Sequence, residues 1–215
     1  GGSPAGMRAE VAPAMALYRR ERTGAGDVVD VALYEPLMFI IGDMIINYTG
    51  TGFVQGRVGN GTGSASPRGV YQAADGKWLS IAASNQGIAI RLFHAMGRPD
   101  ILEDPRFATN AARMEHNDAI QAIVSAWVAA RPRHEVLAVL DEHEVVCSQV
   151  NDASDIVADP HFSERTLVEL TGSEALGRVL TPGPILHMGG YDGPVYAGVP
   201  TIGEHTDEVL LAAGL

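Results

Sequence analysis

The chain has 215 residues, of which 46% are hydrophobic and 19% are charged, the balance of an ordinary soluble globular protein. Its formal net charge of −11 argues against nucleic acid as a partner, because binding nucleic acid requires a basic face. No apolar run approaches the roughly 18 residues that a membrane span needs, and the first residues lack the pattern of a secretory signal. We therefore expect a cytoplasmic protein that binds no membrane.

The first residue is glycine and not methionine, which is consistent with a chain that begins inside a longer one. A helix is expected from Met7 to Arg22, and the glycines of Thr23–Gly26 end it. Pro13 is unfavourable in its interior, because proline removes one backbone hydrogen bond. The following segment Ala32–Ile46 is apolar on more than one face, so we expect it to be buried on several sides.

A β-hairpin is expected over Gly69–Ala83. Asp75 and Gly76 form its tight turn, because glycine accepts the positive φ of hairpin turns, and both arms are rich in β-branched and aromatic residues. A glycine-rich run, Val58–Ser64, precedes the hairpin. A helix over 87–96 follows it.

Later elements follow from the same periodicity and capping signals. Amphipathic helices are expected over 116–130 and 133–142, and a buried strand over Val145–Val150. The remaining expectations concern the last 65 residues. They are a helix N-cap cluster at Asn151–Asp155, a helix opening at Asp159–Phe162, strands over Thr166–Leu170 and Gly177–Leu180 joined by a polar turn, and a loop over Thr181–Gly198.

Neither cysteine nor histidine offers a site. The only cysteine, Cys147, excludes an internal disulfide framework and stands among apolar residues, so we expect a small buried side chain and not a nucleophile. The seven histidines lack the spacing of metal ligands, so no metal is expected. His205, Glu204 and Asp207 together resemble part of a metal-ligand set. Acidic residues in the first turn of a terminal helix explain the group more simply.

Several motifs, in this order, resemble the family III CoA-transferases, the CaiB/BaiF group that also contains the α-methylacyl-CoA racemases. They are RERTGAGDVVDV at Arg20–Val31, the glycine-rich run with its hairpin, DPRF at Asp104–Phe107, NAAR at Asn110–Arg113, VND at Val150–Asp152 and GEHTDEVL at Gly203–Leu210. The resemblance covers nearly all of this chain but only the C-terminal part of the family, and it implies the family's own C-terminus.

The resemblance implies an α+β (α/β) fold. Residues 1–50 would be the end of the family's larger nucleotide-fold domain with a linker helix, and residues 51–165 would be a small α+β domain with a hairpin and several helices. Residues 166–215 would return to the large domain. Segments 7–47 and 180–215 are expected to pack away from the small domain, and family members form interlocked dimers.

The resemblance also implies chemistry. The family moves CoA between carboxylic acids, with an aspartate as nucleophile, because the thiolate of CoA readily attacks an anhydride of that carboxylate. The matching position here is Gly2, or Gly1 if the register slips by one, and glycine cannot be acylated. Glu10, the nearest carboxylate, lies about two helical turns further on, so we assign no catalytic residue. The family's CoA-binding half precedes this region.

Four residues are the candidates for binding substrate. The glycines Gly59, Gly61 and Gly63 resemble a loop that covers the acyl end, where glycines let backbone N–H groups approach developing negative charge; a plain linker is the alternative. Asn85 occupies the position of a racemase glutamate, and an amide cannot act as a base, so it fits the transferases better.

Three hypotheses follow. The chain is the C-terminal part of a CoA-transferase, or a racemase-like enzyme, or a non-catalytic binding or assembly subunit. Coenzyme A and acyl-CoA would be substrates, with a carboxylic acid as acceptor and no covalently bound cofactor. The chain would act as a homodimer or paired with an N-terminal half, because the apolar segment Ala32–Ile46 has too little partner surface within one chain.

Overall fold

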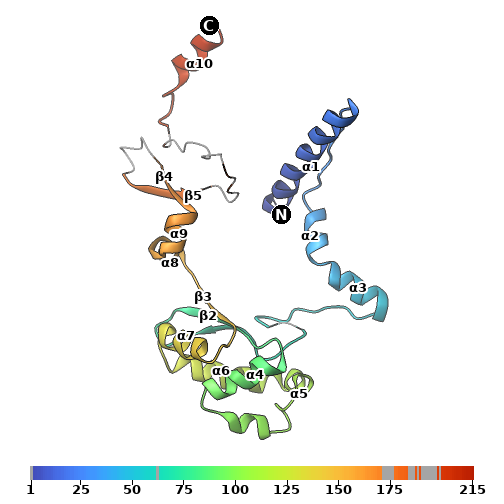
Figure 1. The fold of residues 1–215 in the computed structure, drawn as a ribbon, viewed down its shortest axis with the longest axis vertical. Helices are drawn as coiled ribbons and strands as arrows, with labels where there is room; N and C mark the ends of the chain where they lie inside the picture. Colours follow the sequence, from blue (N-terminus) through green and yellow to red (C-terminus); the bar gives the residue numbers. More distant parts are fainter. Residues whose placement is uncertain are drawn as a thin grey trace. The chain divides into compact units, whose positions relative to one another are not determined.

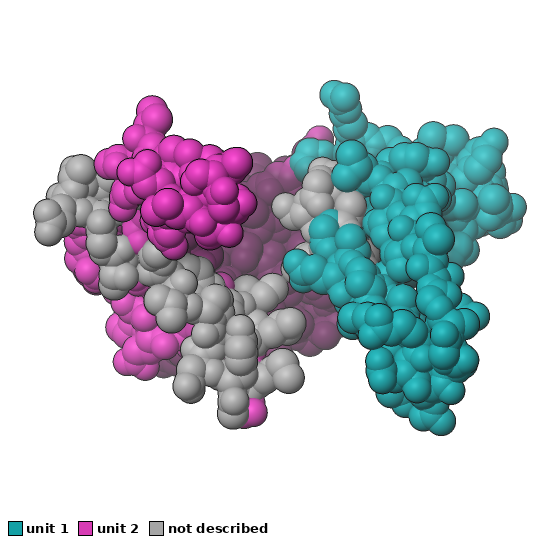
Figure 2. All heavy atoms as spheres, turned by 90° about the horizontal axis from the view of Figure 1, so that it is seen from above, with its two compact units in different colours: residues 1–59 teal, residues 60–215 magenta. Residues whose placement is uncertain are grey.

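The computed structural model describes residues 2–61, 63–170, 177–183, 187, 189, 198 and 200–215, and of residues 2–5, 7 and 8 it describes the backbone alone. It has the mixed α+β content that the sequence predicts. The chain divides into two compact units, residues 1–59 and residues 60–215, drawn in two colours in Figure 2. Among the helices within the described ranges, none combines the length and the apolarity that crossing a bilayer requires.

Unit 1 contains three helices. The first is α1, Gly2–Thr23, which includes the helix expected over 7–22 but begins earlier and keeps Pro13 in its interior. It ends at Gly24, whose φ of 72° belongs to the left-handed region that glycine adopts without strain. The others are α2, Glu35–Ile40, and α3, Gly42–Thr51.

Within this chain the segment Ala32–Ile46 is exposed, as its small partner surface in one chain predicts, and its burial on several sides stays a prediction for an assembly with a second chain. In α2 and α3 only Pro36 is buried. The large apolar side chains of the segment are exposed: Leu33, Leu37, Met38, Phe39, Ile40, Ile41, Met44, Ile45 and Ile46. Three helices in fewer than sixty residues supply no second layer that could cover every face of the segment.

Unit 2 is built on a three-stranded antiparallel sheet in the order β1-β2-β3. The hairpin is confirmed: β1 is Arg68–Gln72, β2 is Trp78–Ala82, and Tyr71 lies opposite Leu79. Gly76 has a φ of 76°, and the Asp75 carboxylate accepts a hydrogen bond of 3.1 Å from the backbone N–H of Lys77. The turn therefore uses both features that predicted it.

The third strand differs from its prediction. A buried strand is expected over Val145–Val150, but β3 is Cys147–Val150 and it lies at an edge of the sheet, paired with β2. Val145 is buried, whereas Ser148, Gln149 and Val150 are exposed. The apolar run signalled a strand, but an edge strand leaves one side uncovered.

Helices cover one face of the sheet (Figure 1). The predicted helices are confirmed as α4, Gln86–Ala95, α6, Asn117–Ala129, and α7, Arg133–Glu142. A short 3₁₀ helix, Pro99–Glu103, and α5, Asn110–Glu115, complete the layer. Residues facing inward from these elements form the core: Tyr71, Leu79, Ile81, Ala89, Leu92, Phe93, Ile101, Phe107, Ile120, Val124, Val128, Val136 and Leu140.

A C-terminal arm continues from β3. Its helices are α8, Ala153–Ala158, and α9, Pro160–Arg165, followed by the antiparallel strands β4, Leu167–Leu170, and β5, Val179–Pro182, and by α10, Thr206–Ala212. The two predicted strands are confirmed. Residues 171–176 of the expected turn, and most of the loop expected over Thr181–Gly198, lie outside the described residues, while Thr181 and Pro182 belong to β5.

Ion pairs fasten the start of this arm to the sheet. Asp152 caps α8 and forms a capping box with Asp155, as the N-cap cluster predicts. Lys77 Nζ lies 2.6 Å from Asp152 and 3.2 Å from Asp155, and Arg133 Nη1 lies 3.2 Å from Asp155. Hydrogen bonds from Lys77 lower the pKa of Asp152, and those from Arg133 lower the pKa of Asp155.

Candidate functional site

The position expected for a catalytic carboxylate is the first residue of α1. Gly2 begins this helix, and Glu10 is an exposed residue further along it. Eight residues of α-helix separate the two positions by about 12 Å along the axis, so the Glu10 carboxylate does not replace one at Gly2. No group of histidine, cysteine and acidic side chains suited to a metal ion occurs in the described parts of the chain.

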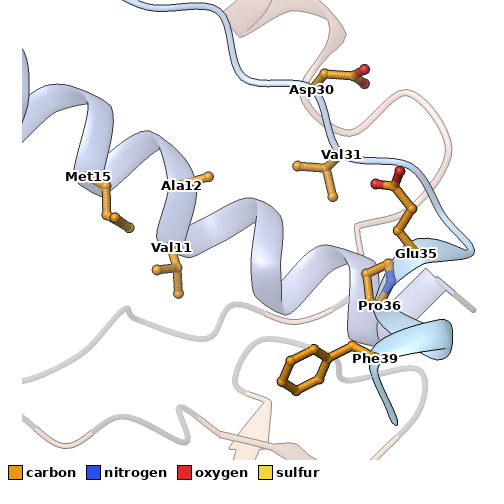
Figure 3. Close-up of a pocket in the computed structure, with 8 residues that line it drawn as sticks. All are labelled: Val11, Ala12, Met15, Asp30, Val31, Glu35, Pro36 and Phe39. Atoms are coloured by element: carbon orange, nitrogen blue, oxygen red, sulfur yellow. The ribbon is translucent and has the colours of Figure 1, made fainter. Parts of the chain in front are cut away.

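Unit 1 contains a pocket of about 710 Å³ between α1 and the segment that leads into α2. Figure 3 shows Val11, Ala12 and Met15 on α1 facing this pocket, with the exposed carboxylates of Asp30 and Glu35 on the other chain segment. Its lining is mainly apolar and is completed by Val31, Pro36 and Phe39. Such a surface suits apolar contact better than acid–base chemistry.

The three candidate glycines lie at the junction of the two units. Gly59 adopts a φ of 63°, Gly61 is half-buried and Gly63 is exposed, while Thr62 lies outside the described residues. The side chain of Asn60, between Gly59 and Gly61, donates a hydrogen bond to the backbone carbonyl of Val70 in β1. Asn60 therefore lies against the first strand of the hairpin.

Asn85 has a structural task. It is the N-cap of α4, and its Oδ1 accepts a hydrogen bond of 2.9 Å from the backbone N–H of Ile88. That bond satisfies one of the four N–H groups that the start of a helix leaves without a partner. Asn85 is exposed as well as being the cap of this helix.

Four side chains on α5 and α6 hold the segment between the glycines and the hairpin. We call Asn110, Arg113, Asn117 and Gln121 the polar stripe. Asn110 donates to the carbonyl of Ser64 at 3.0 Å and accepts from the N–H of Ser66 at 3.2 Å. Arg113 Nε donates to the carbonyl of Ser66 at 2.6 Å, and the Ser66 hydroxyl donates to Asn117 at 2.8 Å. Gln121 donates to the carbonyl of Arg68 at 3.1 Å.

Arg113 is the centre of this stripe. Its side chain is 0% exposed, as is Ser66. Nη1 donates to the carbonyl of Phe107 at 2.9 Å and to Gln86 Oε1 at 3.1 Å, whereas Nη2 is buried without a partner. Burial lowers the pKa of the Arg113 guanidinium. Burying such a group is costly unless its donors are paired, which indicates a specific reason for its presence.

The sequence spacing of the stripe residues is regular, although the sequence predicts no role for them. Asn110 and Arg113 belong to a motif quoted for the family resemblance, but no role was given to either. Positions 110, 113, 117 and 121 follow the spacing of one helical face, with four polar side chains on it. That spacing by itself does not distinguish a buried polar face from one that faces solvent.

Cys147 is only partly buried, where a buried side chain was expected, and it packs against the core of unit 2. Burial, together with the charge of Asp141, raises the pKa of the thiol. Because the thiolate is the reactive form, a raised pKa disfavours a nucleophilic function.

Comparison with known proteins identifies the group to which this fold belongs. Residues 3–206 match the family model described as CoA-transferase family III. The chain belongs to CoA-transferase family III. It is similar to the succinyl-CoA–D-citramalate CoA-transferase of Chloroflexus aurantiacus, with 32% identity over 210 residues, which cover 98% of this chain and 52% of the relative.

Other family III proteins agree with this assignment. The alpha subunit of a succinyl-CoA–L-malate CoA-transferase from Chloroflexus aurantiacus is 31% identical over 196 residues, covering 91% of this chain and 46% of that subunit. The crystal structure of a CaiB/BaiF family protein from Brucella suis matches with a TM-score of 0.79 and 26% identity, over 97% of this chain and 53% of that one. This chain thus spans about half the length of the family III relatives that it matches.

Proposed function

We propose that this chain is the C-terminal part of a family III CoA-transferase, an enzyme that moves CoA between carboxylic acids. Residues 1–50 and 166–215 belong to the larger nucleotide-fold domain in this proposal, and residues 51–165 form the small domain. Acyl-CoA and a free carboxylic acid are the substrates, and no covalently bound cofactor takes part. The cytoplasm is its proposed location.

The observation that carries the proposal is the family match over residues 3–206, together with relatives named as CoA-transferases that are about twice as long. The chain contributes the small domain and the glycines Gly59, Gly61 and Gly63. Their backbone N–H groups would lie near the acyl end, where negative charge develops. The nucleotide of CoA would be bound by the half of the enzyme that corresponds to the rest of the relatives' length.

The 215-residue polypeptide alone is proposed to be inactive. In the transferase reaction a carboxylate oxygen attacks the thioester carbonyl, the CoA thiolate leaves, and an anhydride remains on the enzyme. Gly2 supplies no carboxylate for this step, and Glu10 lies too far along α1. Holding the thioester and the acid together provides several kcal/mol of the catalytic effect, and half of a site cannot provide it.

Exposed apolar surface supports association with a second chain. Large side chains such as Leu37, Ile40, Met44 and Ile46 are exposed in unit 1, and the pocket beside α1 is mainly apolar. We propose that a second copy, or an N-terminal half, covers this surface. An interlocked homodimer is the arrangement that the family suggests.

A non-catalytic subunit is the second candidate. Two of the relatives are named as the alpha and beta subunits of a CoA-transferase, which is consistent with two chains having different roles in one enzyme. A glycine at the nucleophile position fits a subunit that binds or assembles and leaves acylation to its partner. The racemase hypothesis is less favoured, because Asn85 caps α4 through its carbonyl oxygen and offers no base.

The test follows exchange of labelled CoA among several pairs of acyl-CoA and free acid, with the 215-residue chain as the only protein. We expect no exchange above the uncatalysed rate, and none from Gly2→Asp alone, since the nucleotide site is still missing. Exchange by the unaltered chain would contradict the proposal and indicate a different nucleophile. Glu10→Gln would then be the first variant to examine.

A further inference from the structure

The polar stripe Asn110, Arg113, Asn117 and Gln121 bonds to one short piece of chain. Its partners in that piece are Ser64, Ser66 and Arg68, every second residue from the end of the glycine-rich run to the first residue of β1. The stripe residues share a helical face, and the C-terminal pair lies on α6, whose other side packs in the core. A rigid helical layer therefore meets a non-helical segment through side chain to backbone bonds.

The same segment is held from the other side. The N–H of Ala83, after β2, donates to the carbonyl of Pro67 at 3.2 Å. Tyr71 in β1 donates to Gln121 Oε1 at 2.5 Å, so Gln121 links the stripe to both the segment and the hairpin. Burial raises the pKa of the Tyr71 hydroxyl, which keeps it a donor across the ordinary pH range. The segment is thus fixed in place immediately before the hairpin.

We propose that the polar stripe is a positioning element for residues 64–68 and for Gly63, which directly precedes them, and that Arg113 is its principal positioning residue. The inference rests on the proposed function, because the position of Gly63 matters only if the acyl end of the substrate lies beside it. Arg113 acts through the backbone of Ser66 and touches no substrate itself.

The alternative is that Arg113 only supports the core. The two roles differ in which backbone amides lose protection when the guanidinium is removed. A core residue raises exchange throughout the helices and sheet, because its loss lowers global stability. A positioning residue raises exchange in Ser64–Arg68 beyond that background, since the carbonyl of Ser66 loses its charged partner.

Hydrogen exchange of the 215-residue chain, without any acyl-CoA, distinguishes the two roles. Arg113→Met keeps the side-chain length but removes every donor, and the backbone N–H of Ser66, which donates to Asn110 at 3.2 Å, is expected to exchange about tenfold faster beyond the global change. Amides of β2 should follow the global change alone. Val128→Ala is the matched control, because Val128 is buried on α6 and makes no bond to the segment.

Two further variants keep the test decisive if Arg113→Met does not fold. Arg113→Lys retains the charge and a donor, so it should recover part of the protection, which a volume effect would not do. Ser66→Ala removes the bond to Asn117 with little change of volume, and Ser80→Ala on β2 is its control. Ser66→Ala should raise exchange in residues 64–68, whereas Ser80→Ala should not.

The readout also separates this inference from the proposed function. If Arg113→Met and Ser66→Ala change residues 64–68 no more than their controls do, the positioning role is wrong, whatever the enzyme catalyses. If the segment responds as expected, and the completed enzyme still exchanges no CoA, the proposed function fails and the positioning of the segment stands.

Discussion

The cap at Asn85 gives the sharpest prediction about stability. Asn85→Ala removes the side-chain oxygen that accepts from Ile88 at 2.9 Å and leaves that N–H without its protein partner. Loss of an N-cap costs about 0.5–2 kcal/mol, and because Asn85 is exposed, water replaces part of the bond. We expect the free energy of unfolding of unit 2 to fall by about 1 kcal/mol.

Asn85→Asp should show no such loss. A carboxylate accepts the same bond, and a negative charge is favourable at the N-terminus of a helix. The neighbouring Ser84→Ala is the control, since Ser84 is exposed and outside the cap. Its effect should stay within a few tenths of a kcal/mol, the usual range for such a surface position.

Urea unfolding followed by tryptophan fluorescence measures these changes, because Trp78 and Trp127 both lie in unit 2. The midpoint should move while the slope with denaturant stays constant. The reasoning is refuted if Asn85→Ala unfolds like the unaltered chain, or if Asn85→Asp is as unstable as Asn85→Ala. Either result would mean that the bond between Asn85 and Ile88 does not stabilise α4 as a helix cap.

Three further predictions concern acid, packing and association. The pKa of Asp155 is lowered in the folded state, so the stability that its carboxylate contributes is present above its ordinary pKa and is lost as pH falls below about 4. Asp155→Asn should therefore flatten the acid limb of a plot of unfolding free energy against pH, and an unchanged limb would contradict this. Leu92→Ala, at a fully buried position of α4, should cost about 2–5 kcal/mol in urea unfolding, and a cost below about 1 kcal/mol would mean that the core is packed differently. The chain should sediment as a dimer or larger at micromolar concentration, and Ile46→Glu should weaken that association; a compact monomer would contradict it.

Local chemistry made much of unit 2 predictable. Asp75 and Gly76 specify their turn directly, and Asp152 with Asp155 specify a capping box, because each uses contacts within a few residues. The helices around Leu92, Ile120 and Leu140 followed from apolar periodicity, which one buried face produces. These elements need no knowledge of distant partners.

Burial against other segments was harder to predict. The apolar pattern of Ala32–Ile46 indicates a covered surface but not which chain covers it, so its burial by a second chain stays a prediction. Val145–Val150 has the pattern of a strand, and its place at the sheet edge depends on pairing with β2. The polar stripe was missed because it acts on residues distant in the sequence: the bond from Arg113 to the carbonyl of Ser66 spans more than forty positions.

We propose above all that this chain supplies one part of a CoA-transferase site and that a second part completes it. The most direct measurement is CoA exchange after co-purification with a second polypeptide. That polypeptide corresponds to the half of the D-citramalate relative that this chain does not match. Exchange should appear only when that half is present and Gly2→Asp restores the carboxylate. CoA exchange by the 215-residue chain alone would contradict the claim. So would the absence of exchange when a folded Gly2→Asp variant is bound to that half.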